Sequence, residues 1–225
     1  MGDTTGNRLA LPEQGQRLPA AQRRALIEDA AVQMFAAEGF SGASLEEIAT
    51  RAGVTKPLLY RHFASKAELY VGLLEDEMRG LLAGVAAAVE DQEDPEARLR
   101  AGMEAFFSYV ERRPFARRLL FRDPEAHAEA AAAHDRVQRE MTGALAALLG
   151  SNPRLLARDP QRELTIELFA QVLKTALNGV AAWWFAHPDT SRETIVTRTM
   201  QLLAPGLREL EEPLPGRRAA GERTS

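Results

Sequence analysis

The sequence has no cysteine, which excludes disulfide bonds and thiolate metal sites. It also lacks any uninterrupted run of about eighteen apolar residues, the length that a membrane-spanning helix requires. The first twenty residues contain no apolar core of the kind found in secretion signals. These absences predict a cytoplasmic protein, and no residue pattern indicates a metal site or a cofactor.

A large excess of one sign of charge is missing as well, since 28 Lys or Arg and 32 Asp or Glu give a formal net charge of −4 over 225 residues. Residues 1–66 carry eight Lys or Arg and seven Asp or Glu, whereas the remainder carries twenty and twenty-five. A nucleic-acid partner would therefore need a basic surface made locally by the fold. The acidic remainder suggests a separate task for the second part of the chain.

Strand patterns are missing too, whereas helix signals recur along the chain. We expect an all-α protein of about nine helices, with starts marked by Pro95, Pro114, Pro124 and Pro160 and by a Thr190–Glu193 capping box. The predicted organisation has four parts: a disordered tail at 1–20, a helix-turn-helix domain at 21–66, a helical ligand-binding and dimerisation domain at 67–210, and a disordered tail at 211–225.

Residues 44–66 are the most informative segment. Ser44 and Glu47 form a capping box for a short helix, and Gly53 ends that helix. Thr55 and Pro57 then begin a second short helix. Its inward positions are Leu59 and Phe63, which leaves a mostly polar outward set of Lys56, Leu58, Tyr60, Arg61 and His62.

This outward set is poorly explained by packing and well explained by insertion into a groove lined with phosphates. A second capping box, Ser65–Glu68, places Lys66 in the first turn of the next helix, where a cation opposes the helix dipole unless an anion is near. The alternative is a purely structural helix pair joined by a glycine turn. The candidate DNA-binding residues are Ser44, Thr55, Lys56, Pro57, Leu58, Tyr60, Arg61, His62 and Lys66.

The segment from about Gln22 to Leu74 resembles the N-terminal domain of TetR-family transcriptional regulators. The matching residues are Ala30, Phe35, Gly39-Phe40, Ser44-Leu45-Glu46-Glu47-Ile48-Ala49, Ala52-Gly53-Val54, Leu59-Tyr60-Arg61-His62-Phe63 and Ser65-Lys66. The resemblance implies that Lys56, Pro57, Leu58, Tyr60 and His62 face DNA and that Lys66 touches a phosphate. It also implies a homodimer built on the last two helices of each subunit.

The helix expected at about 160–186 is apolar on more than one side, which predicts burial against both the domain core and a second subunit. For the Trp183–Trp184 pair, core packing, the dimer interface and a pocket all remain open. The candidate dimer-interface residues are Leu173, Val180, Trp184, Ile195 and Leu202.

A small-molecule pocket is indicated by aromatic and Met residues that share helix faces with a few polar groups. The alternative is that these residues simply fill the core. His127 and His134 lie two helical turns apart, roughly 10 Å, which is too far to share a metal ion. The candidate ligand-binding residues are Met103, Phe106, Phe107, Phe121, His134, Gln138, Met141, Phe169 and Asn178.

Together these observations predict a ligand-responsive, sequence-specific DNA-binding regulator. In this hypothesis it is a repressor that a mainly hydrophobic small molecule releases from a palindromic, double-stranded operator. One alternative is an effector-independent DNA-binding or architectural protein. A helical enzyme is a weaker alternative, because the sequence shows no nucleophile–base pair, carboxylate pair or phosphate loop.

Overall fold

The computed structural model describes residues 19–121, 127–152, 155–157 and 159–211. Over these ranges the chain forms nine α-helices and no strand, so the all-α prediction is confirmed. The helices are α1 (Ala20–Gly42), α2 (Leu45–Arg51), α3 (Lys56–His62), α4 (Lys66–Val89), α5 (Pro95–Arg112), α6 (Pro114–Phe121), α7 (Ala128–Gly150), α8 (Arg162–Phe185) and α9 (Arg192–Glu211).

Two sequence-based expectations fall on residues that the structure leaves undescribed. The disordered tails correspond almost entirely to residues 1–18 and 212–225, which lie outside the described ranges. The helix start expected at Asp123-Pro124 lies outside them as well, and the helix that follows begins at Ala128.

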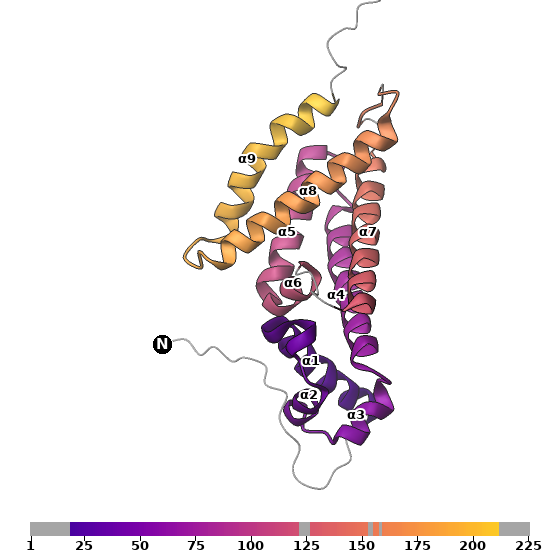
Figure 1. Cartoon of the computed structure of the whole chain (residues 1–225). Coiled ribbons are helices and arrows are strands. Elements are labelled where there is room, and N and C mark those ends of the chain that lie inside the picture. The colour runs from indigo at the N-terminus through magenta and orange to yellow at the C-terminus, as the bar shows by residue number, and fades with distance from the viewer. Residues whose placement is uncertain (1–18, 122–126, 153–154, 158, 212–225) are drawn as a thin grey trace, which may run out of the picture.

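Helix α4 connects the two ends of the molecule, as Figure 1 shows. Helices α1, α2 and α3 form one end. There α1 packs against both α2 and α4, and α3 packs against α2. Along the rest of its length α4 packs against α5 and α7, while α8 lies on α7 and α9 lies on α5. Contacts between α1 and α6 add a second link between the two ends.

The small N-terminal unit closes around a set of buried apolar side chains. Ile27, Phe35, Ile48 and Leu59 are all buried there, and Phe35 and Phe40 both lie edge-on to Tyr70 of α4. These aromatic contacts join the unit to the first part of α4. The packing therefore fixes how α3 is held relative to the long helix.

Two glycines allow the turns in this unit. Gly39 has φ +73°, which kinks α1 at that residue, and helical structure continues beyond it to Gly42. Gly53, with φ +65°, occupies the left-handed conformation predicted for the end of α2.

The helix starts were predicted correctly in part. The Ser65 hydroxyl accepts a hydrogen bond from Glu68 N at 3.0 Å, and the Glu68 carboxylate accepts one from Ala64 N at 2.7 Å, so this cap is confirmed. The Ser44 hydroxyl instead accepts from Glu46 N at 3.2 Å. The Glu47 partner expected for Ser44 was therefore wrong, because the hydroxyl reaches the second helical N–H rather than the third.

The last cap also differs from the prediction. Ser191, not Thr190, caps the start of α9, because its hydroxyl accepts a hydrogen bond from Thr194 N at 3.2 Å. Thr190 is used differently, since its carbonyl accepts a 2.7 Å hydrogen bond from the indole N–H of Trp184. None of the helices in the described ranges is long and apolar enough to cross a membrane.

Gly53, which has a positive φ, and Gly84, which lies inside a helix, give a matched test of the fold. Gly53→Ala should lower the free energy of unfolding by about 1 kcal/mol, because φ is positive there. Gly84→Ala, inside α4 at a position where an added Cβ would meet no other atom, should raise it by about 0.5–1 kcal/mol. Urea unfolding of both variants would measure this, and equal effects would contradict the assignment of the α2 end.

Candidate DNA-binding surface and apolar cavity

The outward face of α3 carries the side chains that the sequence pattern placed there. Leu59 is fully buried and anchors the helix, while Phe63 closes its C-terminal end. The side chains of Lys56, Pro57, Tyr60 and Arg61 are exposed, and those of Leu58 and His62 are half-buried. An exposed fraction of 47% at Tyr60 leaves its ring free to meet a partner. DNA contact by these residues stays a prediction.

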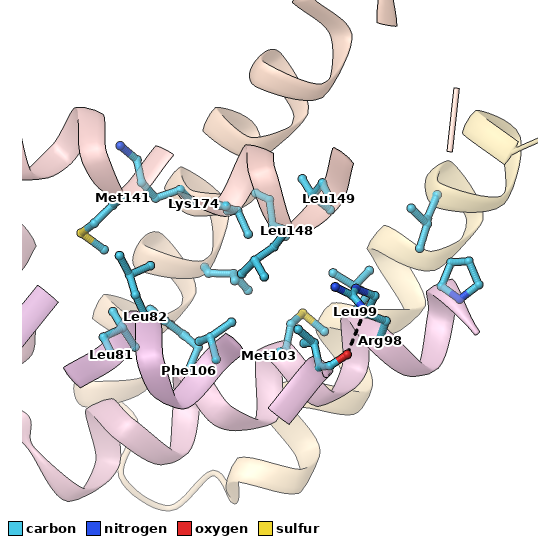
Figure 2. A pocket seen from close by; sticks show the side chains of 18 of the residues that line it. Leu81, Leu82, Arg98, Leu99, Met103, Phe106, Met141, Leu148, Leu149 and Lys174 are labelled. Carbon is cyan, nitrogen blue, oxygen red and sulfur yellow. Dashed lines mark hydrogen bonds between the residues drawn. The ribbon is translucent and has the colours of Figure 1, made fainter. Parts of the chain in front are cut away.

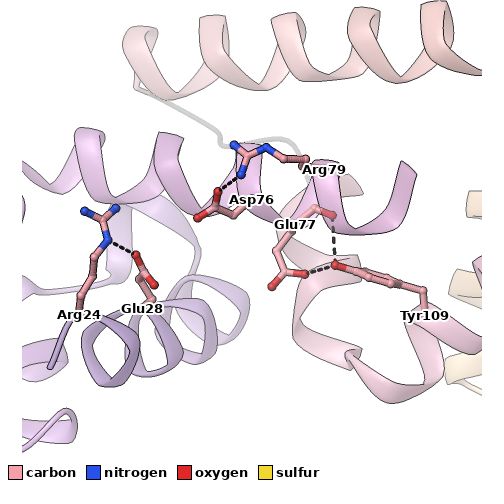
Figure 3. A network of polar contacts seen from close by, with 6 residues as sticks. All are labelled: Arg24, Glu28, Asp76, Glu77, Arg79 and Tyr109. Atoms are coloured by element: carbon pink, nitrogen blue, oxygen red, sulfur yellow. Dashed lines mark hydrogen bonds and ion pairs between the residues drawn. The ribbon is translucent and has the colours of Figure 1, made fainter. Parts of the chain in front are cut away.

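Side chains of neighbouring helices contact α3 at both of its ends. The guanidinium of Arg24 in α1 lies 4.8 Å from the centre of the Phe63 ring, a cation–π contact, and pairs with Glu28 at 2.7 Å (Figure 3). At the other end Lys56 forms an exposed ion pair with Glu46 of α2 at 3.4 Å. An exposed pair of this length contributes little to stability, so it leaves Lys56 available to DNA.

Thr55 and Ser44, which were also predicted to contact DNA, lie at the starts of α3 and α2. Thr55 is the N-cap residue of α3, but its side chain makes no capping hydrogen bond, so only its backbone has the predicted role. The Ser44 hydroxyl is engaged in the cap of α2.

Lys66 has acceptors within the protein. Its Nζ donates to the Ala43 carbonyl at 3.0 Å, lies 3.5 Å from the Ser41 carbonyl oxygen, and sits 4.6 Å from the centre of the Phe40 ring. Partial burial lowers the pKa of the Lys66 ammonium, because it removes water from the charged form. The side chain therefore ties the start of α4 to the end of α1. A contact of Lys66 with phosphate remains a prediction.

A largely apolar cavity of about 110 Å³ lies among α4, α5, α7 and α8. Figure 2 shows Leu81 and Leu82 of α4, Met103 and Phe106 of α5, and Met141 of α7 around it. Four of the candidate ligand-binding residues thus line this cavity: Met103, Phe106, Phe121 and Met141.

The other five candidates do not line it. Phe107 is fully buried and packs edge-on against Trp184 at 5.9 Å between ring centres. His134 and Gln138 both bond the Leu120 carbonyl, through the ring Nε2 of His134 and the amide N–H of Gln138. These contacts hold α7 against the end of α6, so shared faces on a helix were not enough to place either residue in the cavity.

Phe169 and Asn178, on α8, complete that group of five. Phe169 is partly buried against the core. The Oδ1 atom of Asn178 is buried and has no hydrogen-bond partner among the described residues. Contact of Phe169 and Asn178 with a ligand stays a prediction.

Sequence reasoning missed the contribution of α4 and of two cations to the cavity. Leu81, Leu82, Val85 and Val89 line it from α4, but nothing in their spacing along the sequence separates a cavity wall from a packed core. The cations are Arg98 of α5 and Lys174 of α8. A lone Lys within an apolar helix would have been a usable signal at position 174.

The candidate interface residues divide according to their burial. Leu173, Trp184 and Ile195 are buried within the chain itself, which opposes their prediction as interface residues, and Leu173 lines the cavity. Val180 is half-buried, while Leu202 is 81% exposed. Helix α8 instead exposes a line of apolar side chains, which we call the α8 stripe: Leu164, Leu168, Val172 and Trp183.

A buried polar network joins α4 to α5. The hydroxyl of Tyr109 donates to the Glu77 carboxylate at 2.6 Å and lies 3.1 Å from the Glu77 carbonyl oxygen, as Figure 3 shows. Arg113 pairs with the same carboxylate at 2.8 Å. Burial, and then the neighbouring Glu77 carboxylate, raises the pKa of Tyr109 above its usual range. No cluster of three or more metal-ligating side chains occurs within the described ranges.

Comparison with known proteins identifies the N-terminal unit. Residues 27–73 match the family of bacterial regulatory proteins of the tetR type. The similarity to the tetR family of regulatory proteins therefore lies in the N-terminal unit and the start of α4. Over 107 residues it is 44% identical to the HTH-type transcriptional activator FasR of Mycolicibacterium smegmatis, a match that covers 48% of this chain and 49% of FasR. The chain thus spans about half the length of this relative.

Solved structures extend the similarity to the whole fold. A TetR-like transcriptional regulator from Rhodococcus sp. RHA1 superposes with a TM-score of 0.68 at 27% identity, over 85% of this chain and 99% of that one. The regulator FadR of Bacillus subtilis, solved with stearoyl-CoA, gives 0.68 at 16% identity, over 81% of this chain and 98% of FadR. The second likeness concerns the fold alone.

The different contacts of Lys66 and Lys56 predict that replacing each by Met will change the free energy of unfolding by different amounts. Lys66→Met should lower the free energy of unfolding by about 1 kcal/mol without DNA, because the carbonyls of Ser41 and Ala43 lose their donor. Lys56→Met should change it by less than about 0.5 kcal/mol, since only an exposed ion pair is lost. Thermal unfolding without DNA tests this, and two equal effects would deny Lys66 its structural role.

Proposed function

We propose that this protein is a sequence-specific DNA-binding transcriptional regulator that places α3 in the major groove of its operator. The observation that supports this most directly is the division of α3 between one buried anchor, Leu59, and an outward face of Lys56, Tyr60 and Arg61. Cations and a tyrosine at the exposed side of a short helix suit phosphates and base edges. The match of residues 27–73 to the tetR family of bacterial regulatory proteins supports the same function.

The regulator acts as a homodimer in this proposal. The α8 stripe and Leu202 of α9 are apolar side chains that are at least half exposed in the single chain. A water-exposed apolar surface of this kind suits a second copy of the same face. A two-fold dimer presents two α3 helices, so its operator is a palindrome with half-sites about one turn apart.

We further propose that an apolar small molecule binds the cavity and changes operator affinity. The cavity wall includes Leu81, Leu82 and Val89, which belong to the same helix that begins at Lys66 beside the DNA-binding unit. A ligand that favours one position of α4 shifts the population of DNA-binding conformations by its differential affinity. The bound stearoyl-CoA named for FadR of B. subtilis supports an effector with an acyl chain.

The direction of regulation is that of a repressor released by its effector. FasR is named a transcriptional activator, so the sign requires its own test. Transcription in vitro from an operator-bearing promoter should fall on addition of the protein and recover with the effector. A rise on addition of the protein would assign activation instead. Binding to DNA that no cavity ligand alters would favour the effector-independent alternative.

Substitutions on α3 should separate base reading from structure. Lys56→Ala should weaken operator binding by about 1–3 kcal/mol if Lys56 contacts a guanine, and should affect a scrambled duplex less. Tyr60→Phe should also weaken operator binding, with no change in melting temperature, because the ring is exposed. Fluorescence anisotropy with both duplexes measures this. Equal losses on both duplexes would reassign Lys56 to a phosphate.

The dimer proposal can be tested on the α8 stripe. Leu168→Glu should produce a monomer at micromolar concentration while leaving helix content unchanged, because Leu168 is 61% exposed in the single chain. Glu163→Gln, on the same helix but facing the α7–α8 groove, is the matched control and should remain dimeric. Sedimentation velocity distinguishes the two. A monomeric wild type, or a dimeric Leu168→Glu, would contradict the proposed interface.

A further inference from the structure

Lys174 lies at the junction between the apolar cavity and a neighbouring surface groove. Its side chain lines the apolar cavity and also an open groove between α7 and α8. Its Nζ donates a 3.1 Å hydrogen bond to the Gln138 carbonyl, and it forms no ion pair with any residue in the described ranges. Burial lowers the pKa of Lys174, and no neighbouring carboxylate offsets that loss of hydration.

Arg98, the other basic residue that lines the cavity, has a structural role. The guanidinium of Arg98 donates to the carbonyls of Val89 and Gln92 and to the Ser151 hydroxyl. In the groove, Arg162 is committed in the same way to backbone carbonyls at the end of α7 and beyond. Lys174 differs from both, because an ammonium has three donors and the protein uses one of them.

We propose that Lys174 is the head-group contact of the effector site, and that the effector is an apolar molecule ending in a single carboxylate. Its hydrocarbon part would fill the cavity and its carboxylate would bind Lys174 Nζ at the junction. This inference rests on the proposed effector function of the cavity. A partly desolvated ammonium gains most from an anion, since charge-assisted hydrogen bonds are the strong ones.

The groove argues for a small head group rather than a polyanionic one. Asp135, Glu163 and Glu167 line it, and so do Arg139, Arg162 and Lys174, so its acidic and basic side chains balance. A groove of balanced charge has no excess of cations to attract a chain of phosphates that extends along it. A single carboxylate held at the junction meets Lys174, which lines both the groove and the cavity, without extending along the groove. The proposed ligand class is therefore a free carboxylic acid with an aliphatic or aromatic body.

The test compares an acid with its uncharged ester. Isothermal titration calorimetry of the full-length protein with octanoate and with methyl octanoate measures the contribution of the charge. Octanoate should bind wild type at least about tenfold more tightly than the ester, which corresponds to one charged hydrogen bond. Lys174→Met keeps the apolar stem and removes the charge, so it should bind both ligands with similar affinity.

Arg139→Met is the matched control, because Arg139 is an exposed cation of the same groove that does not line the cavity. It should retain the preference for octanoate. Melting curves without ligand verify that each variant is folded. Loss of melting cooperativity in Lys174→Met would move the test to Lys174→Gln, which should also lose the preference.

Each outcome has a definite meaning. Equal binding of acid and ester by wild type, or a preference that survives in Lys174→Met, overturns the head-group contact but leaves the cavity as an apolar ligand site. Binding of neither ligand overturns the cavity as an acyl effector site as well as the role of Lys174. Octanoyl-CoA is the third probe, and tighter binding of it than of octanoate would overturn the single-carboxylate ligand.

Discussion

The structure depends on the apolar packing of one long helix, α4. Near its start Leu69, Tyr70 and Leu74 are buried against the DNA-binding unit, and further along Leu81 and Val89 are buried among α5 and α7. Burial of such side chains contributes roughly 1.5–3 kcal/mol each, so the helix cannot leave either neighbour without a large loss. The same helix therefore both orients α3 and forms a wall of the cavity.

Much of the fold followed from local signals, because caps, prolines and glycines act over a few residues. Pro95 and Ser65 marked helix starts that the structure confirms, and Gly53 marked an end. The outward face of α3 could be predicted for a similar reason, since a seven-residue helix has one obvious apolar side. Thr190 shows the limit, because its spacing to Glu193 suits a capping box, yet Ser191 caps the helix and the Thr190 carbonyl accepts a hydrogen bond from Trp184.

The cavity and the interface could not be predicted to the same degree. Whether an apolar side chain lines a space, fills a core or faces water depends on how several helices meet, and periodicity within one helix does not contain that information. Phe106 and Phe107 are neighbours on α5, yet one lines the cavity and the other packs on Trp184. The Trp183–Trp184 pair divides in the same manner, with Trp184 buried and Trp183 exposed.

The buried network of Glu77 and Tyr109 has a mechanical consequence. It fastens α4 to α5 near the midpoint of α4, because the Tyr109 hydroxyl contacts both the carboxylate and the backbone of Glu77. Sliding of α4 along α5 would break these buried bonds, whereas a small tilt about Glu77 keeps them. A helix of 24 residues is about 36 Å long, so a pivot near its middle gives two arms of similar length. Outward pressure on the cavity arm would then move the Lys66 arm by a comparable distance in the opposite direction.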